Sequence, residues 1–144
     1  MTNSRPLRFS GRRAVLLAVA LAIVHVCCGN SNTTGPDETF SQTRTLPVLE
    51  SFGVAFAAQR NGTVEVNVDW SRAANDIQVY AAADTCATFD VLRSGGCNVV
   101  AFSESPTAKP ETLTFSALQG TRYTVFAVNL GPGSDTVTIQ LIAR

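Results

Sequence analysis

An alternation of apolar and polar residues between positions 63 and 70 constrains the fold of this chain more than any other feature. Its apolar members are Val64, Val66, Val68 and Trp70, and its polar members are Glu65, Asn67 and Asp69. Because successive side chains of a strand point to opposite faces, the pattern predicts a β-strand with one dry face and one solvated face. A shift of one residue would bury the polar set, at about 1–3 kcal/mol for each unpaired group.

Further strand patterns follow Pro47, and no segment has a sustained helical period. They lie at 52–56, 76–81, 98–103, 112–115, 122–129 and 135–142, and a helical turn is expected only at 87–93. Asn61-Gly62 is a frequent hairpin turn, so 52–56 and 63–70 are predicted to form a hairpin. The continuous apolar run at 98–103 is typical of a fully buried strand. Segment 122–129 is apolar on both faces, which predicts a central strand.

About seven short strands separated by turns predict an all-β fold, an antiparallel β-sandwich over residues 47–144. Two stacked sheets bury the apolar face of each strand in one shared core. Besides the four apolar residues named above, we expect buried side chains at Ile77, Val79, Tyr123, Val125, Val137, Ile139 and Leu141.

The N-terminal part of the chain has the components of an export signal. Arg12 and Arg13 precede an apolar run at 14–26, which ends on Cys27 and Cys28. The run is shorter than the about 20 residues that a membrane-spanning helix needs, so cleavage is favoured over a permanent span. Residues 28–46 are polar and too poor in hydrophobes to form a core, which predicts a disordered tether.

A signal that ends on a cysteine and is followed by a polar linker resembles the precursors of bacterial lipoproteins. The resemblance implies a signal peptide at 1–27 and a lipid attached to Cys28, with Cys27 as the second choice. It places the protein in the bacterial cell envelope, anchored to the outer membrane or on the periplasmic face. Two alternatives stay open: cleavage by a general signal peptidase, which gives a free periplasmic or secreted protein, and an uncleaved anchor.

The charge of the part after Cys28 excludes one class of partner. It holds seven basic and 11 acidic residues, a formal charge of −4, although the whole chain has a formal charge of zero. No basic cluster is available to neutralise phosphates, so nucleic acid is not expected as a partner. His25 is the only histidine and lies in the signal, so the commonest general base and metal ligand is missing from the domain. We expect no cofactor and no metal.

The two remaining cysteines, Cys86 and Cys97, predict a disulfide, because paired thiols in an exported protein are most simply oxidised. The bond would close a loop of 12 residues and stabilise the fold by about 3 kcal/mol. A redox role is disfavoured because the spacing is not C-x-x-C.

The order of motifs between Gly62 and Ala143 resembles the bacterial pre-peptidase C-terminal domain. VEVNVDW ends a strand in Trp70, NDIQVY takes the place of that family's Asp-rich strand, and GTRYTVFAVN and DTVTIQL follow. Gln78 replaces the second acid of the Asp-rich strand. The resemblance implies a jelly-roll-like β-sandwich and the role of a non-catalytic accessory module.

Candidate ligand residues lie at strand ends, where the loops of a sandwich gather. Asp69, Asp76 and Asp135 are candidates for loops that hold a ligand or Ca²⁺, although solvated carboxylates are the simpler interpretation because no EF-hand spacing is present. Trp70 and Tyr80 are candidates for a sugar-binding platform, but Trp70 shares the apolar face of its strand, which favours a core role.

Catalysis is not expected. Glu104 and Glu111 flank a loop and are a candidate acid pair, but among 11 acidic residues such a pair arises readily by chance. The sequence favours a non-catalytic module that binds a surface polymer, such as a carbohydrate, or a partner protein of the envelope. A purely structural envelope lipoprotein without a specific ligand is the alternative, and a small secreted hydrolase is the outsider.

Overall fold

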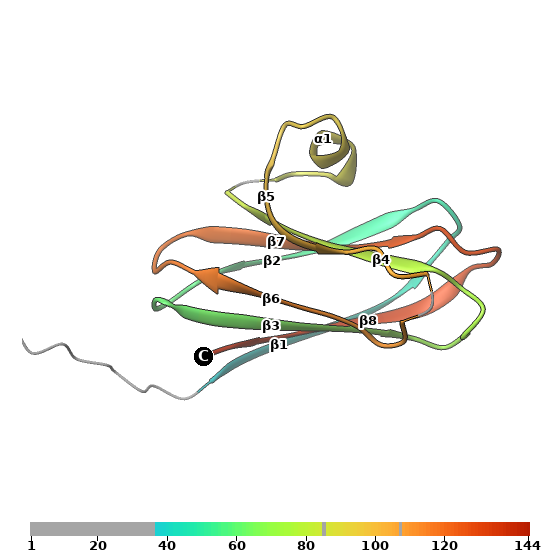
Figure 1. Cartoon of the computed structure of the whole chain (residues 1–144), viewed down its shortest axis with the longest axis horizontal. Helices are drawn as coiled ribbons and strands as arrows, with labels where there is room; N and C mark the ends of the chain where they lie inside the picture. The colour runs from blue at the N-terminus through green and yellow to red at the C-terminus, as the bar shows by residue number, and fades with distance from the viewer. Residues whose placement is uncertain (1–36, 85, 107) are drawn as a thin grey trace, which may run out of the picture. The chain divides into compact units, whose positions relative to one another are not determined.

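The structure is a computed structural model that describes residues 37–84, 86–106 and 108–144. This part forms eight strands and one short helix (Figure 1). Their bounds are β1 (Glu38–Leu46), β2 (Ser51–Ala57), β3 (Gly62–Trp70), β4 (Ile77–Ala83), α1 (Phe89–Arg93), β5 (Asn98–Ser103), β6 (Glu111–Ala117), β7 (Arg122–Asn129) and β8 (Asp135–Ala143). The expected signal peptide and both candidate lipidation sites lie outside the described residues. Within the described ranges, no helix has the length and hydropathy of a membrane span.

The strands form two antiparallel four-stranded sheets that pack face to face. Sheet A has the order β1-β8-β3-β6, and sheet B has the order β2-β7-β4-β5. This order, with each strand of sheet A facing its sequence neighbour in sheet B, is that of a jelly roll. The predicted all-β jelly-roll-like sandwich is therefore confirmed, with eight strands in place of about seven.

The core lies between the two sheets, and its residues are those that the alternation predicts. Every side chain expected to be buried is buried, with Val64, Val68, Ile77, Val125, Val137, Ile139 and Leu141 fully enclosed. Aromatic rings from both sheets meet near one end, where Tyr123 lies 5.6 Å from Phe56 and 5.1 Å from Phe115, measured between centroids. Each buried Val, Leu, Ile or Phe side chain contributes about 1.5–3 kcal/mol.

The boundary between tether and domain is corrected by β1. Residues 38–46, which the sequence predicts as part of a disordered tether, form an edge strand that pairs with β8 from Glu38↔Ala143 to Leu46↔Asp135. Only Phe40 and Leu46 of this strand pack against the core. Backbone hydrogen bonds to the neighbouring strand hold an edge strand in place, so it needs few apolar residues. The composition of this segment therefore resembles that of a disordered one.

The predicted hairpin between 52–56 and 63–70 is wrong. β2 pairs with β7 in sheet B, whereas β3 pairs with β6 and β8 in sheet A. Residues 58–61 carry the chain from one sheet to the other. The apolar faces of β2 and β3 both line the core, but from opposite sheets, and a period of two is the same in that arrangement as in a hairpin.

Strand β5 is also corrected, because it is an edge strand and not a buried one. It pairs only with β4, and the exposed fractions are 39% for Val99, 38% for Val100 and 62% for Phe102. A register shift between Ala81 and Ala82 puts a bulge into this pair, which makes the edge a poor template for a further strand. The predicted central position of β7, between β2 and β4, is confirmed.

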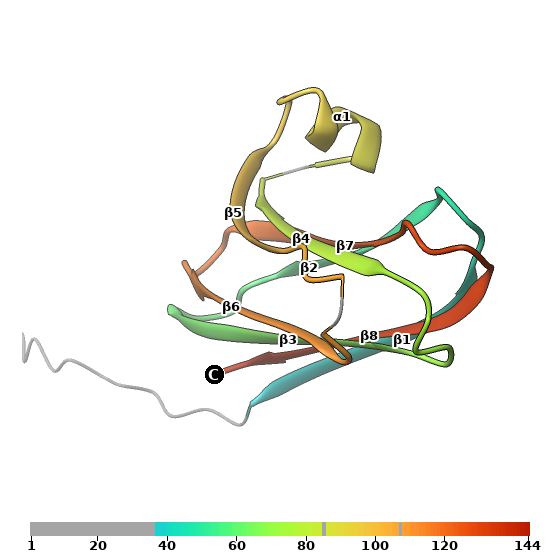
Figure 2. The ribbon, with the colours of Figure 1, turned by 45° about the vertical axis from the view of Figure 1, so that its right-hand side comes forward.

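The insert between β4 and β5 covers the outer side of sheet B (Figure 2). We call residues 86–97 the disulfide flap, because the predicted Cys86–Cys97 bond joins its ends across a Cα–Cα distance of 5.5 Å. The expected helical turn is α1, and the Thr88 hydroxyl caps it by accepting from the Val91 N–H at 3.3 Å. A second small apolar cluster lies under the flap and comprises Ala82, Cys86, Leu92 and Phe126, with Tyr80, Phe89 and Cys97 packed against it.

Candidate functional site

Asp135 lies at the start of β8 and ties two loops together at one end of the sandwich. It is 3% exposed, and its carboxylate accepts from the backbone N–H groups of Ser71 and Arg72, each at 3.0 Å, and of Thr136 at 2.7 Å. The Ser71 hydroxyl and the Asn75 amide, the latter at 2.7 Å, also donate to it. These donors belong to this chain, so the carboxylate has a structural role in the loop.

The electrostatics of Asp135 follow from these contacts. Burial raises its pKa, but the hydrogen bonds from Ser71, Asn75 and Arg72 favour the ionised form and lower the pKa to about 2. The carboxylate is therefore charged at neutral pH.

The other two candidate calcium ligands have different surroundings. Asp69 is exposed and accepts from Lys109 Nζ at 2.6 Å, and this hydrogen bond lowers the pKa of Asp69. Asp76 has a buried Oδ1 without a hydrogen-bond partner within the described residues. Across the part of the chain that the structure describes, no three His, Cys, Asp or Glu side chains group closely enough to hold a metal ion.

The aromatic pair does not form a platform. Trp70 is buried in the core, as the alternation predicts, and its indole N–H donates to the Asn75 carbonyl at 3.1 Å. Tyr80 lies on the opposite sheet under the disulfide flap, with its ring 5.3 Å from Phe89 and 6.4 Å from Phe102, measured between centroids.

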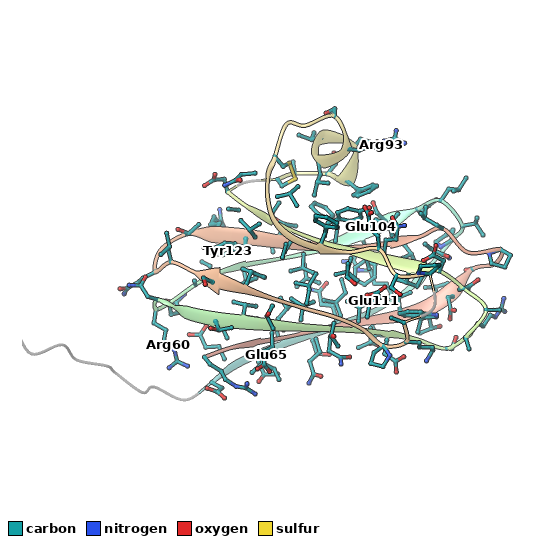
Figure 3. The ribbon with its side chains drawn as sticks, viewed as in Figure 1. Arg60, Glu65, Arg93, Glu104, Glu111 and Tyr123 are labelled. Carbon is teal, nitrogen blue, oxygen red and sulfur yellow. A yellow bond between two sulfur atoms is a disulfide. The ribbon has the colours of Figure 1, made fainter. Side chains whose placement is uncertain are left out.

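Glu104 and Glu111, both labelled in Figure 3, have separate hydrogen-bond partners. Glu111 is 1% exposed and accepts from the Ser103 hydroxyl and from the Ser105 N–H. Glu104 accepts from the Tyr80 hydroxyl on the outer side of sheet B. Each carboxylate is thus satisfied by a hydrogen bond inside the chain.

The outer side of sheet A is a continuous polar surface, which we call the threonine face. It comprises the outward side chains of four strands: Thr39, Ser41, Thr43, Thr45, Thr136, Thr138, Gln140, Ile142, Thr63, Glu65, Asn67, Asp69, Thr112, Thr114 and Ser116. Both carboxylates on it are paired within the chain, Asp69 with Lys109 and Glu65 with Arg144. The threonine face therefore offers hydroxyls and amides and no unpaired charge.

A shallow groove of about 510 Å³ crosses this face over β1, β8 and β3. We call it the β1–β8–β3 groove; its lining is Ser41, Asn67, Asp69, Trp70, Ser71, Thr136, Thr138 and Gln140. Pairing of the strands places Gln140 directly opposite both Ser41 and Asn67, so that these side chains form a row across the groove. The amides of Asn67 and Gln140 make no hydrogen bond within the described part of the chain.

Sequence reasoning found Asp69 and Trp70 as candidates but missed the other groove residues. A polar residue at an outward position carries no signal of its own, because most sheets that face solvent are polar on that side. Only the strand order, which brings β1 and β8 next to β3, shows that Ser41, Gln140 and Asn67 form one row.

Comparisons with known proteins bear on the fold. No protein-family model matches the chain, and no curated protein matches it in sequence. Among solved structures, the periplasmic inhibitor of g-type lysozyme from Aeromonas hydrophila superimposes with a TM-score of 0.56 at 6% identity, over 76% of this chain and 89% of that chain. The mitogen derived from Yersinia pseudotuberculosis superimposes with a TM-score of 0.55 at 9% identity, over 74% of this chain and 86% of that chain. At these identities the likeness establishes a shared β-sandwich fold.

Proposed function

We propose that this protein is an exported, envelope-associated, non-catalytic jelly-roll module that binds a surface polymer or a partner protein through the β1–β8–β3 groove of the threonine face. One observation carries the proposal. The disulfide flap packs over part of the outer side of sheet B and leaves a pocket of about 320 Å³ beside it, whereas the polar face of sheet A has a groove about 510 Å³ in volume and no such flap among the described residues. Ligand sites are usually concave, and a few polar groups in them fix the orientation of the ligand.

Two features support a binding role over catalysis. Glu104 and Glu111, the acid pair considered for hydrolysis, each bind a different group of this chain. The groove contains one carboxylate, Asp69, and Lys109 holds it at 2.6 Å. General acid–base chemistry on a glycosidic bond would use two carboxyl groups that flank the substrate.

A partner protein is the second candidate ligand, and the fold comparison favours it. The structure from Aeromonas hydrophila that shares this fold is an inhibitor of g-type lysozyme. A periplasmic protein with this fold thus inhibits another protein, a g-type lysozyme.

The proposed location rests on the signal and on Cys28, and the Cys86–Cys97 bond is consistent with an oxidising compartment. Metabolic lipid labelling and cell fractionation of the wild type, Cys28→Ala and Cys27→Ala test it. We expect label on the wild type and its loss in Cys28→Ala. An unlabelled wild type in the soluble fraction would contradict the lipid anchor.

The binding function is tested with a glycan array and a pull-down from envelope extract. The variant that removes the groove amides is Asn67→Ala/Gln140→Ala, and its control is Thr63→Ala/Ser116→Ala, an in-register pair on the same face outside the groove. Saturable binding that the first variant loses and the second retains supports the proposal. Silence of the wild type in both assays favours the purely structural alternative.

A further inference from the structure

The side chains of the β1–β8–β3 groove allow its ligand class to be named more narrowly. Ser41, Gln140 and Asn67 lie in one row across three strands, and the next row along the strands is Thr43, Thr138 and Asp69. Strands in a sheet are about 4.8 Å apart, so a chain that lies across them meets a hydroxyl or an amide at each such step. The groups that it meets are both donors and acceptors, which matches a ligand with a hydroxyl on every repeat.

The groove presents no cation to a ligand. Lys109 donates to Asp69 at 2.6 Å and lies 5.6 Å from the centroid of the Trp70 ring, so its charge is already balanced. Arg144 is paired with Glu65 and, at 3.3 Å, with Asp37. An anionic polymer would therefore find no free positive partner in the lining of the groove.

The groove is also not an apolar or aromatic site. Trp70 lines it but is only 4% exposed, and its ring packs into the core. Ile142, the one apolar side chain on the threonine face, lies outside the lining of the groove. Recognition must therefore rest on hydrogen bonds, for which the free amides of Asn67 and Gln140 are the best-placed groups.

We infer that the β1–β8–β3 groove binds an uncharged polyhydroxyl polymer, a neutral polysaccharide, which crosses β1, β8 and β3 and hydrogen-bonds to Ser41, Gln140 and Asn67. This inference rests on the proposed binding function and selects the polymer over the protein. The Thr43 and Thr138 hydroxyls, which bond to each other at 2.8 Å, border the same path.

Affinity electrophoresis of the full chain in a non-ionic detergent tests the ligand class. The first probes are uncharged glucans, mannans and galactans, and the second are the same three polymers after O-methylation. The third set is anionic and consists of polygalacturonate and heparin. We expect at least one unmodified neutral polymer to retard the wild type. O-methylation should abolish the retardation, because it removes the hydroxyl donors while it keeps the shape of the chain.

The same gels with two double variants locate the site. In Asn67→Ala/Gln140→Ala the dissociation constant should rise about tenfold, as expected for the loss of two hydrogen bonds, whereas Thr63→Ala/Ser116→Ala should match the wild type. Two results would overturn the ligand class while the proposed binding function stands. One is retardation by anionic polymers only, and the other is equal retardation by the O-methylated and the unmodified polymers. Capture of an envelope protein through the threonine face without any polymer binding would do the same. Binding to neither polymer nor protein would overturn both proposals.

Discussion

Asp135 shows how one carboxylate can order two loops. Its five donors come from Ser71, Arg72 and Asn75, which lie in the loop between β3 and β4, and from Thr136, the next residue in β8. Because the donors surround both oxygens, the residue must be an acceptor at each of them. An amide at this position would turn a donor toward groups that themselves donate.

The variant Asp135→Asn should therefore lower the free energy of unfolding by about 3 kcal/mol, through loss of charge-assisted hydrogen bonds and a mismatched donor. Chemical denaturation at neutral pH measures the change. The matched control is Asp90→Asn on α1, whose carboxylate is exposed and lies 3.6 Å from Arg93. This control should change stability by less than about 1 kcal/mol, and an equal effect of the two variants would contradict the role given to Asp135.

The pH dependence of stability has a defined sign. The folded-state pKa of Asp135 is about 2, below the reference value of 3.8, so the unfolded chain takes up a proton first as the pH falls. The stabilisation by this carboxylate is complete above the unfolded pKa and is lost as the pH drops from about 4 to about 2. Asp69, whose pKa is also lowered, acts in the same direction. Denaturation at several pH values should show a shallower acid loss in Asp135→Asn than in the wild type.

At this scale the sequence predicts which residues are buried but not which polar groups meet. The alternation at Val64, Val66 and Val68 is a local property, so it is legible without a structure. Three of the four donor residues of Asp135, Ser71, Arg72 and Asn75, are separated from it by 64, 63 and 60 positions, and no local pattern reports them. The row of Ser41, Gln140 and Asn67 likewise joins residues that are distant in sequence, and no local pattern predicts it.

Among the elements, the disulfide flap acts as a separate cover for sheet B. It closes a small cluster of its own, in which Leu92 and Phe126 are buried, apart from the main core between the sheets. Most main-core contacts are independent of the flap. We therefore expect the flap to open more readily than the sandwich unfolds.

The double variant Cys86→Ser/Cys97→Ser should lose about 3 kcal/mol of stability, because the unfolded chain gains the freedom of a 12-residue loop. Hydrogen exchange followed by mass spectrometry should show faster exchange at 86–97 and in the adjoining strand β4. Strand β3 serves as the internal control. The free energy of opening measured from exchange in β3 should stay equal to the free energy of global unfolding of the same variant. Uniform loss of protection in all strands would show that flap and sandwich unfold as one unit.

The elements also show where sequence patterns fail. Periodicity predicts the faces of β3, β7 and β8, but it contains no information about which strand lies next to which. The predicted hairpin of β2 with β3 is wrong for this reason, since both strands supply apolar faces to one core from opposite sheets. The apolar run of β5 is predicted to be buried because composition does not show whether a strand lies at the edge of a sheet. The polar strand β1 is missed because it is held in place by backbone hydrogen bonds to β8.

For the whole molecule, the position of β1 defines the smallest chain that folds. A chain that begins at residue 47 lacks β1, so it exposes the edge of β8 and loses the core contacts of Phe40 and Leu46. We expect it to aggregate or to unfold at low denaturant. A chain that begins at residue 37 retains every strand and should unfold cooperatively, as circular dichroism and thermal melting would show. Equal stability of the two chains would contradict the corrected domain boundary.

The pairing of the first strand with the last has a mechanical consequence. Glu38 lies opposite Ala143, so the start of β1 and the end of β8 are at the same end of the ladder. A force that pulls these two points apart loads the ladder at that end and breaks its hydrogen bonds one after another in a peeling geometry. A force applied along the strands, between Glu38 and the opposite end of β8 near Asp135, loads all the bonds of the ladder together. The sandwich should therefore resist only weak forces applied between Glu38 and Ala143, and much stronger forces applied between Glu38 and Asp135.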